Sequence, residues 1–393
     1  MYVIVERYYK VNRVVLKALG LWPSQQSYFT QILQILYASI LLTFILVQLL
    51  VFITRQYNTD LLFKILSCVC PCLFATIKYF LFIIETKNFK KLLEQIQDDW
   101  NSLKDKFEIN IIEGYACKMK FYTTSSVASC YIGILLLGIL QHLPLILDIM
   151  LPLNESRPYQ LIVITEYFVN QDKYIHVMML HEFLVIFVGS FIIIGTGSIL
   201  VIYIIHICAL LKIASYRIEN AIEKNILEIP SPTREYLLHR KIVHAIVIHR
   251  RAIEFNEFLT SICLLPFATL IVVGVSSLTF NLFLFIHLIT ANKNIMACVT
   301  ATSIIFHLIY LFVANYCGQA VINHAINWFE AIYNGLWYAA PSSTQKLILF
   351  IMQRGRIYLT ISCYSVFVAS LEGFATLTST AVSYFTVIYS TQK

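Results

Sequence analysis

A row of small, mostly hydroxyl-bearing side chains recurs along the last apolar segment of the chain. Thr376, Thr380, Ser383, Val387 and Thr391 follow one another at spacings of four, three, four and four residues. Residues three or four apart share one face of an α-helix. Such a face on a helix in lipid meets either a neighbouring helix, through close packing of small side chains, or the water of a pore. In a pore, Val387 would form a hydrophobic constriction that closes by dewetting.

Aromatic and small side chains in the middle of the chain suggest a second kind of site, an apolar pocket. An apolar pocket with few polar groups suits a small volatile ligand. The residue types alone also describe an ordinary helical core, and they favour that interpretation. The candidates for the pocket are Gly138, Phe183, Phe187, Phe280, Met296, Thr300 and Ser303.

Two lysines lie inside the second apolar segment, where an ionisable side chain is costly. Lys64 and Lys78 each lie near one end of that segment. Their long side chains can carry the amine to the headgroups, and Lys78 could do so toward Glu85. The alternative is a role in binding or gating.

Motifs of catalysis and nucleotide binding are missing from the sequence, which has no G-x-S-x-G, no Walker loop and no H-E-x-x-H. Cys68, Cys70 and Cys72 bracket Pro71, but a spacing of two turns Cys70 to a different helical face, so this is not a metal-ligand pattern. We therefore expect no catalytic residue, no cofactor and no metal.

Composition places these candidate sites in a membrane. Of the 393 residues, 59% are hydrophobic and 13% are charged, whereas soluble domains carry about 25% charged residues. The basic residues lie between the apolar runs rather than in one patch, so the net charge of +7 does not indicate a nucleic-acid partner. A bilayer core needs roughly 20 apolar residues per helix. The sequence predicts an all-α membrane protein with seven transmembrane helices, at 33–53, 61–84, 124–147, 183–206, 258–289, 295–320 and 363–389.

Orientation follows from the distribution of Lys and Arg between the two sides. The N-terminal segment and the loops 85–123, 207–257 and 321–362 hold 22 of these residues, and the opposite side holds five. Positively charged loops stay in the cytoplasm, so we expect an intracellular N-terminus and an extracellular C-terminus. Asn154, in the only N-x-S/T sequon, is then extracellular and open to glycosylation. The apolar residues before Trp22 suit a short helix on the inner membrane surface.

Several short motifs, most of them in the last third of the chain, resemble those of one known family. Gly20-Leu21-Trp22-Pro23 near the N-terminus resembles a motif of the insect odorant receptors, and Met179-Leu180-His181 resembles receptors of ants, bees and wasps. The order and spacing of five further motifs are similar to that family: Cys317-Gly318-Gln319, Leu336-Trp337-Tyr338, Ile351-Met352-Gln353-Arg354, Ser370-Leu371-Glu372-Gly373-Phe374 and Val382-Ser383-Tyr384-Phe385.

This resemblance implies an odorant-gated cation channel of four subunits in the plasma membrane of a sensory dendrite, in which an odour-tuned subunit assembles with an odorant co-receptor. It implies a last helix split into a cytoplasmic and a membrane part. The implied pore and gate residues are Ser383, Val387, Ser390 and Thr391, and the implied subunit anchor holds Trp337, Tyr338 and Arg354. The expected division is 1–32 for the cytoplasmic N-terminal segment, 33–320 for helices one to six with the odorant pocket, 321–362 for the anchor, and 363–393 for the pore helix and tail.

Two departures place the chain within this superfamily. The loop between helices four and five has only about 50 residues, whereas the co-receptor carries a long insertion there, which favours a tuned subunit. The gustatory relatives end in T-Y-x5-Q-F. The matching positions here are Ser383-Tyr384 and Ser390-Thr391, so the Gln and Phe of that motif are missing, which argues against the gustatory branch. The rival functions are a metabotropic seven-helix chemoreceptor and a gustatory-type channel.

The predicted orientation has a direct test. An epitope tag on the N-terminus should bind antibody only after permeabilisation, because basic segments are retained in the cytoplasm. A tag inserted beside Asn154 serves as the control and should bind antibody on intact cells. Labelling of the N-terminal tag on intact cells would reverse the topology.

Overall fold

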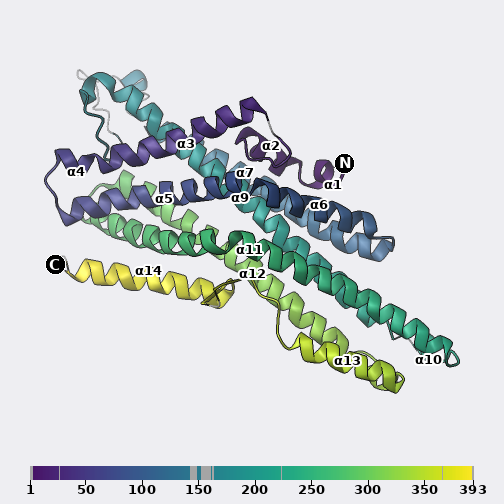
Figure 1. Cartoon of the computed structure of the whole chain (residues 1–393). Helices are drawn as coiled ribbons and strands as arrows, with labels where there is room; N and C mark the ends of the chain where they lie inside the picture. Colours follow the sequence, from purple (N-terminus) through teal and green to yellow (C-terminus); the bar gives the residue numbers. More distant parts are fainter. Residues whose placement is uncertain are drawn as a thin grey trace.

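The computed structural model describes residues 3–25, 27–141, 148–151, 161, 163–222, 224–364 and 366–391. Long helices run side by side along one axis, and the only strands among these residues form one short hairpin (Figure 1). In chain order the elements are α1 (Val3–Tyr8), α2 (Lys10–Ala18), α3 (Tyr28–Leu49), α4 (Val51–Thr54), α5 (Thr59–Ile84), α6 (Thr86–Ser102), α7 (Lys106–Gln141), α9 (Gln171–Glu219), α10 (Lys224–Leu227), α11 (Thr233–Thr290), α12 (Asn294–Tyr333), η1 (Trp337–Ala339), α13 (Ser342–Gly355), β1 (Ser362–Cys363), β2 (Phe367–Val368) and α14 (Leu371–Thr391).

Six helices of the described chain are long and apolar enough to cross a membrane. The first of them combines α3 and α4, and the other five contain α5, α7, α9, α11 and α12. The seventh, α14, has 21 residues and is about 31 Å long at 1.5 Å per residue, which matches a bilayer core. Its Thr and Ser residues lower its apolar character. The fold is therefore an all-α multi-pass membrane protein.

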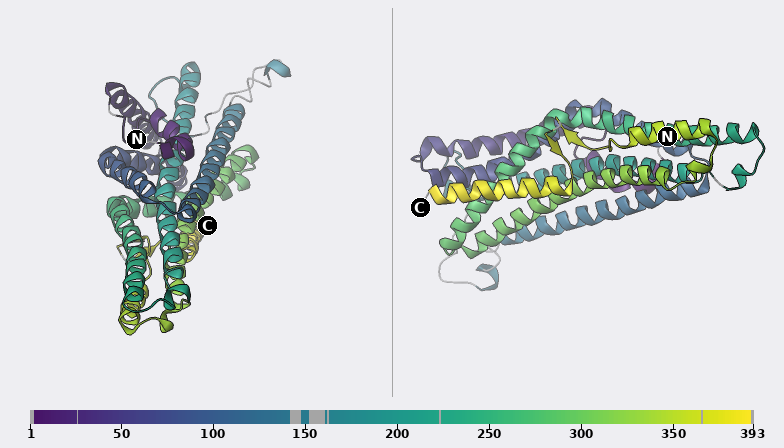
Figure 2. Two further views of the ribbon diagram at one scale, coloured as in Figure 1. Left: turned by 90° about the vertical axis from the view of Figure 1, so that its right-hand side faces the viewer. Right: turned by 90° about the horizontal axis from the view of Figure 1, so that it is seen from below.

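The helices extend far beyond the predicted spans at one end of the molecule. The regions 207–257 and 321–362 were expected as loops, yet α9, α11 and α12 continue into them and reach 49, 58 and 40 residues. Lys and Arg interrupt the apolar pattern but are good helix formers, so a charged stretch need not end a helix. We call this end, which carries α6, α10 and α13, the basic end; α4 and the C-terminus lie at the opposite end (Figures 1 and 2).

The last helix is split, as predicted, but its membrane part begins later than expected. Cys363 lies in a strand, where β1 and β2 pair antiparallel with Cys363 opposite Phe367. A short apolar run does not distinguish strand from helix by periodicity, which explains the error. The helix begins after Ser370, whose hydroxyl caps it by accepting a hydrogen bond from the Gly373 N–H at 3.0 Å.

The start of α14 is also held from α12. The side-chain oxygens of Asn315 and Gln319 accept hydrogen bonds from the backbone N–H groups of Ser370 and Leu371, each at 3.3 Å. Free N–H groups at a helix start need such acceptors, particularly near lipid. The two side chains thus fix the position of α14 against α12.

Buried ion pairs hold the extended helices together at the basic end. The Arg217 guanidinium on α9 donates to both carboxylate oxygens of Glu108 on α7, at 2.6 and 2.8 Å. Asp99 on α6 pairs with His206 on α9 at 2.8 Å and with Arg251 on α11. Removing one partner of such a pair would leave a buried charge uncompensated.

The N-terminal helix packs on protein rather than lying alone on the membrane surface. Val15 and Leu16 of α2 are buried, and both lie against Gly195 of α9. The Asn12 amide donates to the Ser198 hydroxyl of α9 at 2.8 Å. The apolar residues that suggested a surface helix therefore form part of the core.

The fold requires glycine at position 318 on α12, because there is no room for a side chain there. A Cβ there would overlap the carbonyl oxygen of Ala369 in the segment before α14, whereas a Cβ at Gly114 on α7 would meet nothing within 4 Å. Gly318→Ala should lower the thermal stability of the purified protein, since such overlap costs about 1–3 kcal/mol. Gly114→Ala is the matched control and should leave stability equal or higher, because alanine favours helix by about 1 kcal/mol. Melting is measured by size-exclusion chromatography after heating. Equal melting temperatures of the two variants would contradict the close approach of Gly318 to Ala369.

Candidate functional site

The two faces of α14 differ in what they contact. Gly373, Leu377 and Ala381 are buried at successive intervals of four residues. The Thr279 hydroxyl of α11 donates to the Ala381 carbonyl at 3.2 Å, so this buried face lies on α11. Small residues allow the close approach of two helix backbones. The packing face of α14 is therefore the Gly373–Leu377–Ala381 row, not the hydroxyl-bearing row found in the sequence.

The hydroxyl-bearing row is turned away from the rest of the chain. Thr376, Ser383 and Thr391 are exposed, 60% of Val387 is exposed, and Thr380 is half-buried. Phe385 and Ile388, predicted to lie on the opposite face, are half-buried. Within the described chain the row does not serve as a packing face, and we call it the polar stripe.

Hydroxyl groups of the polar stripe bond to the backbone of their own helix. Thr376 donates to the Glu372 carbonyl at 2.9 Å, and Ser383 donates to the Ser379 carbonyl at 2.8 Å. Thr380 likewise donates to the carbonyl of Thr376 at 2.7 Å. Each hydroxyl proton is satisfied internally, while the oxygen lone pairs stay available on the outside of the helix. Such a surface can accept hydrogen bonds from water or interact with a cation.

The predicted odorant residues fall into separate groups. A Cβ at Gly138 of α7 would lie 3.3 Å from the Phe183 ring of α9, so these two positions touch. The rings of Phe183 and Phe187 have centroids 6.4 Å apart. Phe280 of α11 instead stacks on Phe63 of α5, with centroids 5.6 Å apart.

Of the three predicted residues of α12, Ser303 is linked to α11 through His307. Thr300 is buried and donates to the Met296 carbonyl at 2.9 Å. The Ser303 carbonyl is 3.1 Å from a ring nitrogen of His307, whose other nitrogen is 2.9 Å from the Ser277 hydroxyl of α11. His307 and Ser277 form a polar contact between helices that sequence reasoning missed.

Lys78 does not reach the headgroups, so the predicted snorkelling is wrong. The residue is fully buried, and its amine donates a hydrogen bond to the Tyr310 hydroxyl of α12. The amine lies 4.7 Å from the Tyr310 ring centroid and 5.9 Å from that of Phe74. Aromatic faces stabilise a cation by cation–π attraction. The only sign of this contact in the sequence is Phe74, which precedes Lys78 by one helical turn. Tyr310 lies on α12, far away in the sequence, so spacing could not identify it.

Of the three predicted anchor residues, two lie next to each other at the basic end. The Trp337 indole N–H donates to the Tyr333 carbonyl at 3.1 Å, and 65% of Tyr338 is exposed. On the neighbouring α13, 70% of Phe350 is exposed. Large apolar side chains are therefore exposed at this end of the molecule. Asn154, the predicted glycosylation site, lies outside the described residues.

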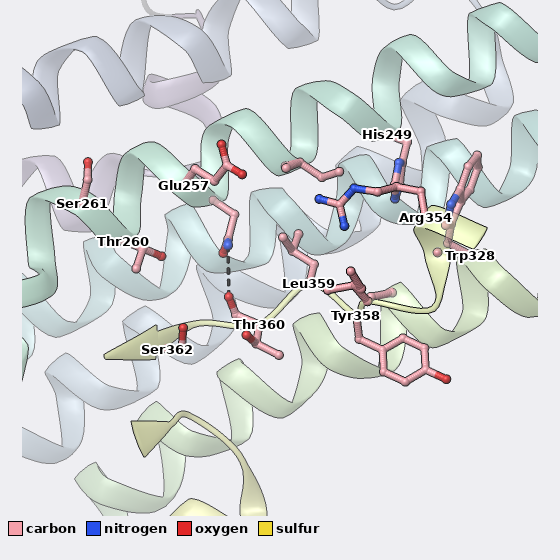
Figure 3. A pocket seen from close by; sticks show the side chains of 15 residues that line it. His249, Glu257, Thr260, Ser261, Trp328, Arg354, Tyr358, Leu359, Thr360 and Ser362 are labelled. Carbon is pink, nitrogen blue, oxygen red and sulfur yellow. Dashed lines mark hydrogen bonds between the residues drawn. The ribbon is translucent and has the colours of Figure 1, made fainter. Parts of the chain in front are cut away.

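The third anchor residue, Arg354, lines a cavity of about 390 Å³ between α11, α12 and the segment after α13 (Figure 3). The rings of His249 and Trp328 are stacked in its wall with centroids 4.4 Å apart. Asn256 donates to the Thr360 carbonyl at 3.1 Å and ties α11 to the segment that leads to α14. The lining residues are spread between positions 249 and 362, so no short sequence motif marks this cavity.

Comparison with known proteins gives consistent matches in sequence. The family profile described as 7tm Odorant receptor matches residues 58–382. Odorant receptor 10 of Aedes albopictus is 28% identical over 155 residues, which is 38% of this chain and 39% of that protein. Odorant receptor Or2 of Anopheles gambiae is 23% identical over 158 residues, with the same coverage of both chains. The matched stretch thus spans about two fifths of each mosquito relative.

Solved structures with the same fold cover the whole chain. The insect olfactory receptor OR5 from Machilis hrabei, in complex with eugenol, superposes with a TM-score of 0.79 at 16% identity and 99% coverage of both chains. A second structure of OR5 gives a TM-score of 0.76 at 17% identity and 98% coverage of both chains. At this identity the likeness concerns the fold. With a family profile matched over most of the sequence and this shared fold, the chain belongs to the insect odorant receptor family.

Proposed function

We propose that this protein is an odour-tuned subunit of an odorant-gated, non-selective cation channel whose pore is lined by α14. One observation carries the proposal: the polar stripe of α14 faces away from the chain's own helices, while the opposite face packs on α11. A row of hydroxyl oxygens in a membrane is best matched by enclosed water. A pore shared between subunits supplies that water.

Val387 is the proposed gate. It is the one large apolar residue on the polar stripe, and its side chain projects away from the bundle. A ring of such side chains around a narrow pore excludes water and therefore ions. Ser390 and Thr391, one turn farther along, would lie near the outer mouth of the pore.

The proposed ligand is a small apolar volatile molecule bound near α7, α9, α11 and α12. The contact of Gly138 with Phe183 and the neighbouring ring of Phe187 supply apolar surface there. The fold relative OR5 was solved with eugenol, which supports this class of ligand. The odorant must bind the open state more tightly than the closed state, because only differential affinity shifts the equilibrium.

The proposed partner is the odorant co-receptor, bound through the anchor. Trp337, Tyr338 and Phe350 present apolar surface at the basic end. Burying this surface against other subunits would hold four chains around one pore, since aromatic residues dominate the energetics of interfaces.

The proposed odorant site predicts a change in ligand ranking. Phe187→Ala should enlarge an apolar pocket and alter the order of odorants in dose–response recordings, favouring bulkier ligands. Phe121→Ala is the control, because Phe121 is 69% exposed nearer the basic end of α7, and it should keep the order. A uniform shift of every odorant by Phe187→Ala would place its effect on gating or stability and the pocket elsewhere.

The proposed pore predicts a pattern of cysteine accessibility. Cysteine at Ser383, Val387 or Thr391 should react with a charged thiol reagent and reduce odorant-evoked current, since these positions lie on the polar stripe. Cysteine at the half-buried Phe385 or Ile388 should stay silent. Val387→Ser should also raise the current without odorant, because a polar ring remains wet.

The chain without introduced cysteines is the control for background reaction with the reagent, because its Cys117 and Cys298 are exposed thiols. Co-receptor subunits contribute their own gate residues, so the leak of the Val387→Ser variant should be partial. Block at positions 385 and 388, with silence at 383, 387 and 391, would overturn the assignment of the pore-lining face.

A further inference from the structure

The only charged residue in the sequence of α14 lies on the same helical face as the polar stripe. Glu372 precedes Thr376 by one helical turn, and residues four apart share a face. Both side chains are exposed. After Glu257 the sequence contains only two acidic residues, Glu330 and Glu372. The stripe of hydroxyl groups is therefore continued, toward the start of α14, by a single negative charge.

The Glu372 carboxylate has no partner within the described part of the chain. Among these residues it makes no ion pair and no hydrogen bond, and Arg356, the basic residue nearest in the sequence, does not pair with it. An acidic side chain in the first turn can stabilise a helix start. Here the N–H groups at the start of α14 already bond to the side chains of Ser370, Asn315 and Gln319. The carboxylate thus faces something outside this chain.

Glu372 lies at one boundary of the hydrocarbon core. Helix α14 is about as long as the core is thick, so its second residue lies at the membrane surface. The helix runs from the hairpin to the C-terminus, away from the basic end (Figure 1). With the basic end in the cytoplasm, as the charge distribution predicts, this boundary is the cytoplasmic one. Water reaches a carboxylate there, so its charge is tolerated.

The cytoplasmic side of the chain is positively charged. The segments 1–32, 85–123, 207–257 and 321–362 hold 22 Lys and Arg against 15 Asp and Glu. This excess repels cations from the inner mouth of a pore. Acidic side chains lining the path of the ions are the means by which cation channels attract cations. A carboxylate on the polar stripe counteracts the repulsion at the place where ions would pass.

We propose that Glu372 lines the inner mouth of the pore and concentrates cations there. This inference rests on the proposed function of α14. A unit negative charge a few ångströms away in water enriches a monovalent cation about threefold and a divalent cation about tenfold, because the attraction doubles with the charge of the ion. Each copy of this chain in the channel contributes one such charge. Glu372 therefore raises the rate at which cytoplasmic cations enter the pore.

The test records odorant-evoked current in excised inside-out patches from cells that express this chain with a co-receptor, with the odorant in the pipette. Glu372→Gln should lower outward current about threefold relative to inward current, and should raise the cytoplasmic Mg²⁺ concentration for half block about tenfold. Glu372→Asp keeps the charge and should behave like the unchanged channel. Glu330→Gln is the matched control, because Glu330 is exposed and lines a groove with Lys212 and Glu219 of α9, away from the polar stripe.

A cysteine variant separates the charge of position 372 from any effect on folding. In Glu372→Cys channels, a negatively charged thiol reagent applied from the cytoplasm should restore outward current, and a positively charged one should lower it further. The chain without introduced cysteines again measures the background reaction. Unchanged rectification and Mg²⁺ block in Glu372→Gln, or equal effects of the two reagents on Glu372→Cys, would overturn the inference while the cysteines of the polar stripe still react. Silence of the polar-stripe cysteines would overturn the pore itself, and this inference with it.

Discussion

Hydrocarbon offers no hydrogen-bond partner, so every polar group inside the bilayer must be matched by protein or by enclosed water. Most of the interior of this protein obeys that constraint through contacts between helices. The amine of Lys78 is bonded to Tyr310, and Ser277 on α11 contacts His307 on α12. The polar stripe of α14 is the exception, because its outward side meets no other part of the described chain. The proposed pore follows from that exception.

Helix α11 connects the parts of the molecule that a gating mechanism must couple. It packs against α5, α9, α12 and α14. It contributes Phe280 to the aromatic contacts with α5, Thr279 to the contact with α14, and Asn256 to the cavity beside Arg354. A shift of α11 on odorant binding would therefore move the buried face of α14 directly.

Sequence reasoning found the periodic row on α14 because one helix carries the whole signal, although the residues alone left open whether the row meets another helix or a pore. The polar stripe is a periodic pattern on a single helix, and α14 has its other face buried as the period requires. It failed where the decisive partner lies on another helix. Lys78 was misplaced because only the fold brings Tyr310 to it, and the cavity is lined by residues more than a hundred positions apart. The start of α14 was placed at Cys363 although the capping Ser370 marks it, because the apolar residues of the hairpin resemble a helical run.

We propose that α14 of this chain lines an ion pore that an odorant opens directly. The most direct measurement is current in excised outside-out patches from cells expressing this chain, a co-receptor, or both, with no nucleotide in the pipette. Odorant-evoked cation current is expected only in patches that contain both chains, because the proposed pore is built from both and needs no cytoplasmic messenger. An odorant response in intact cells that disappears on excision, or that this chain supports through a second messenger without a co-receptor, would contradict it.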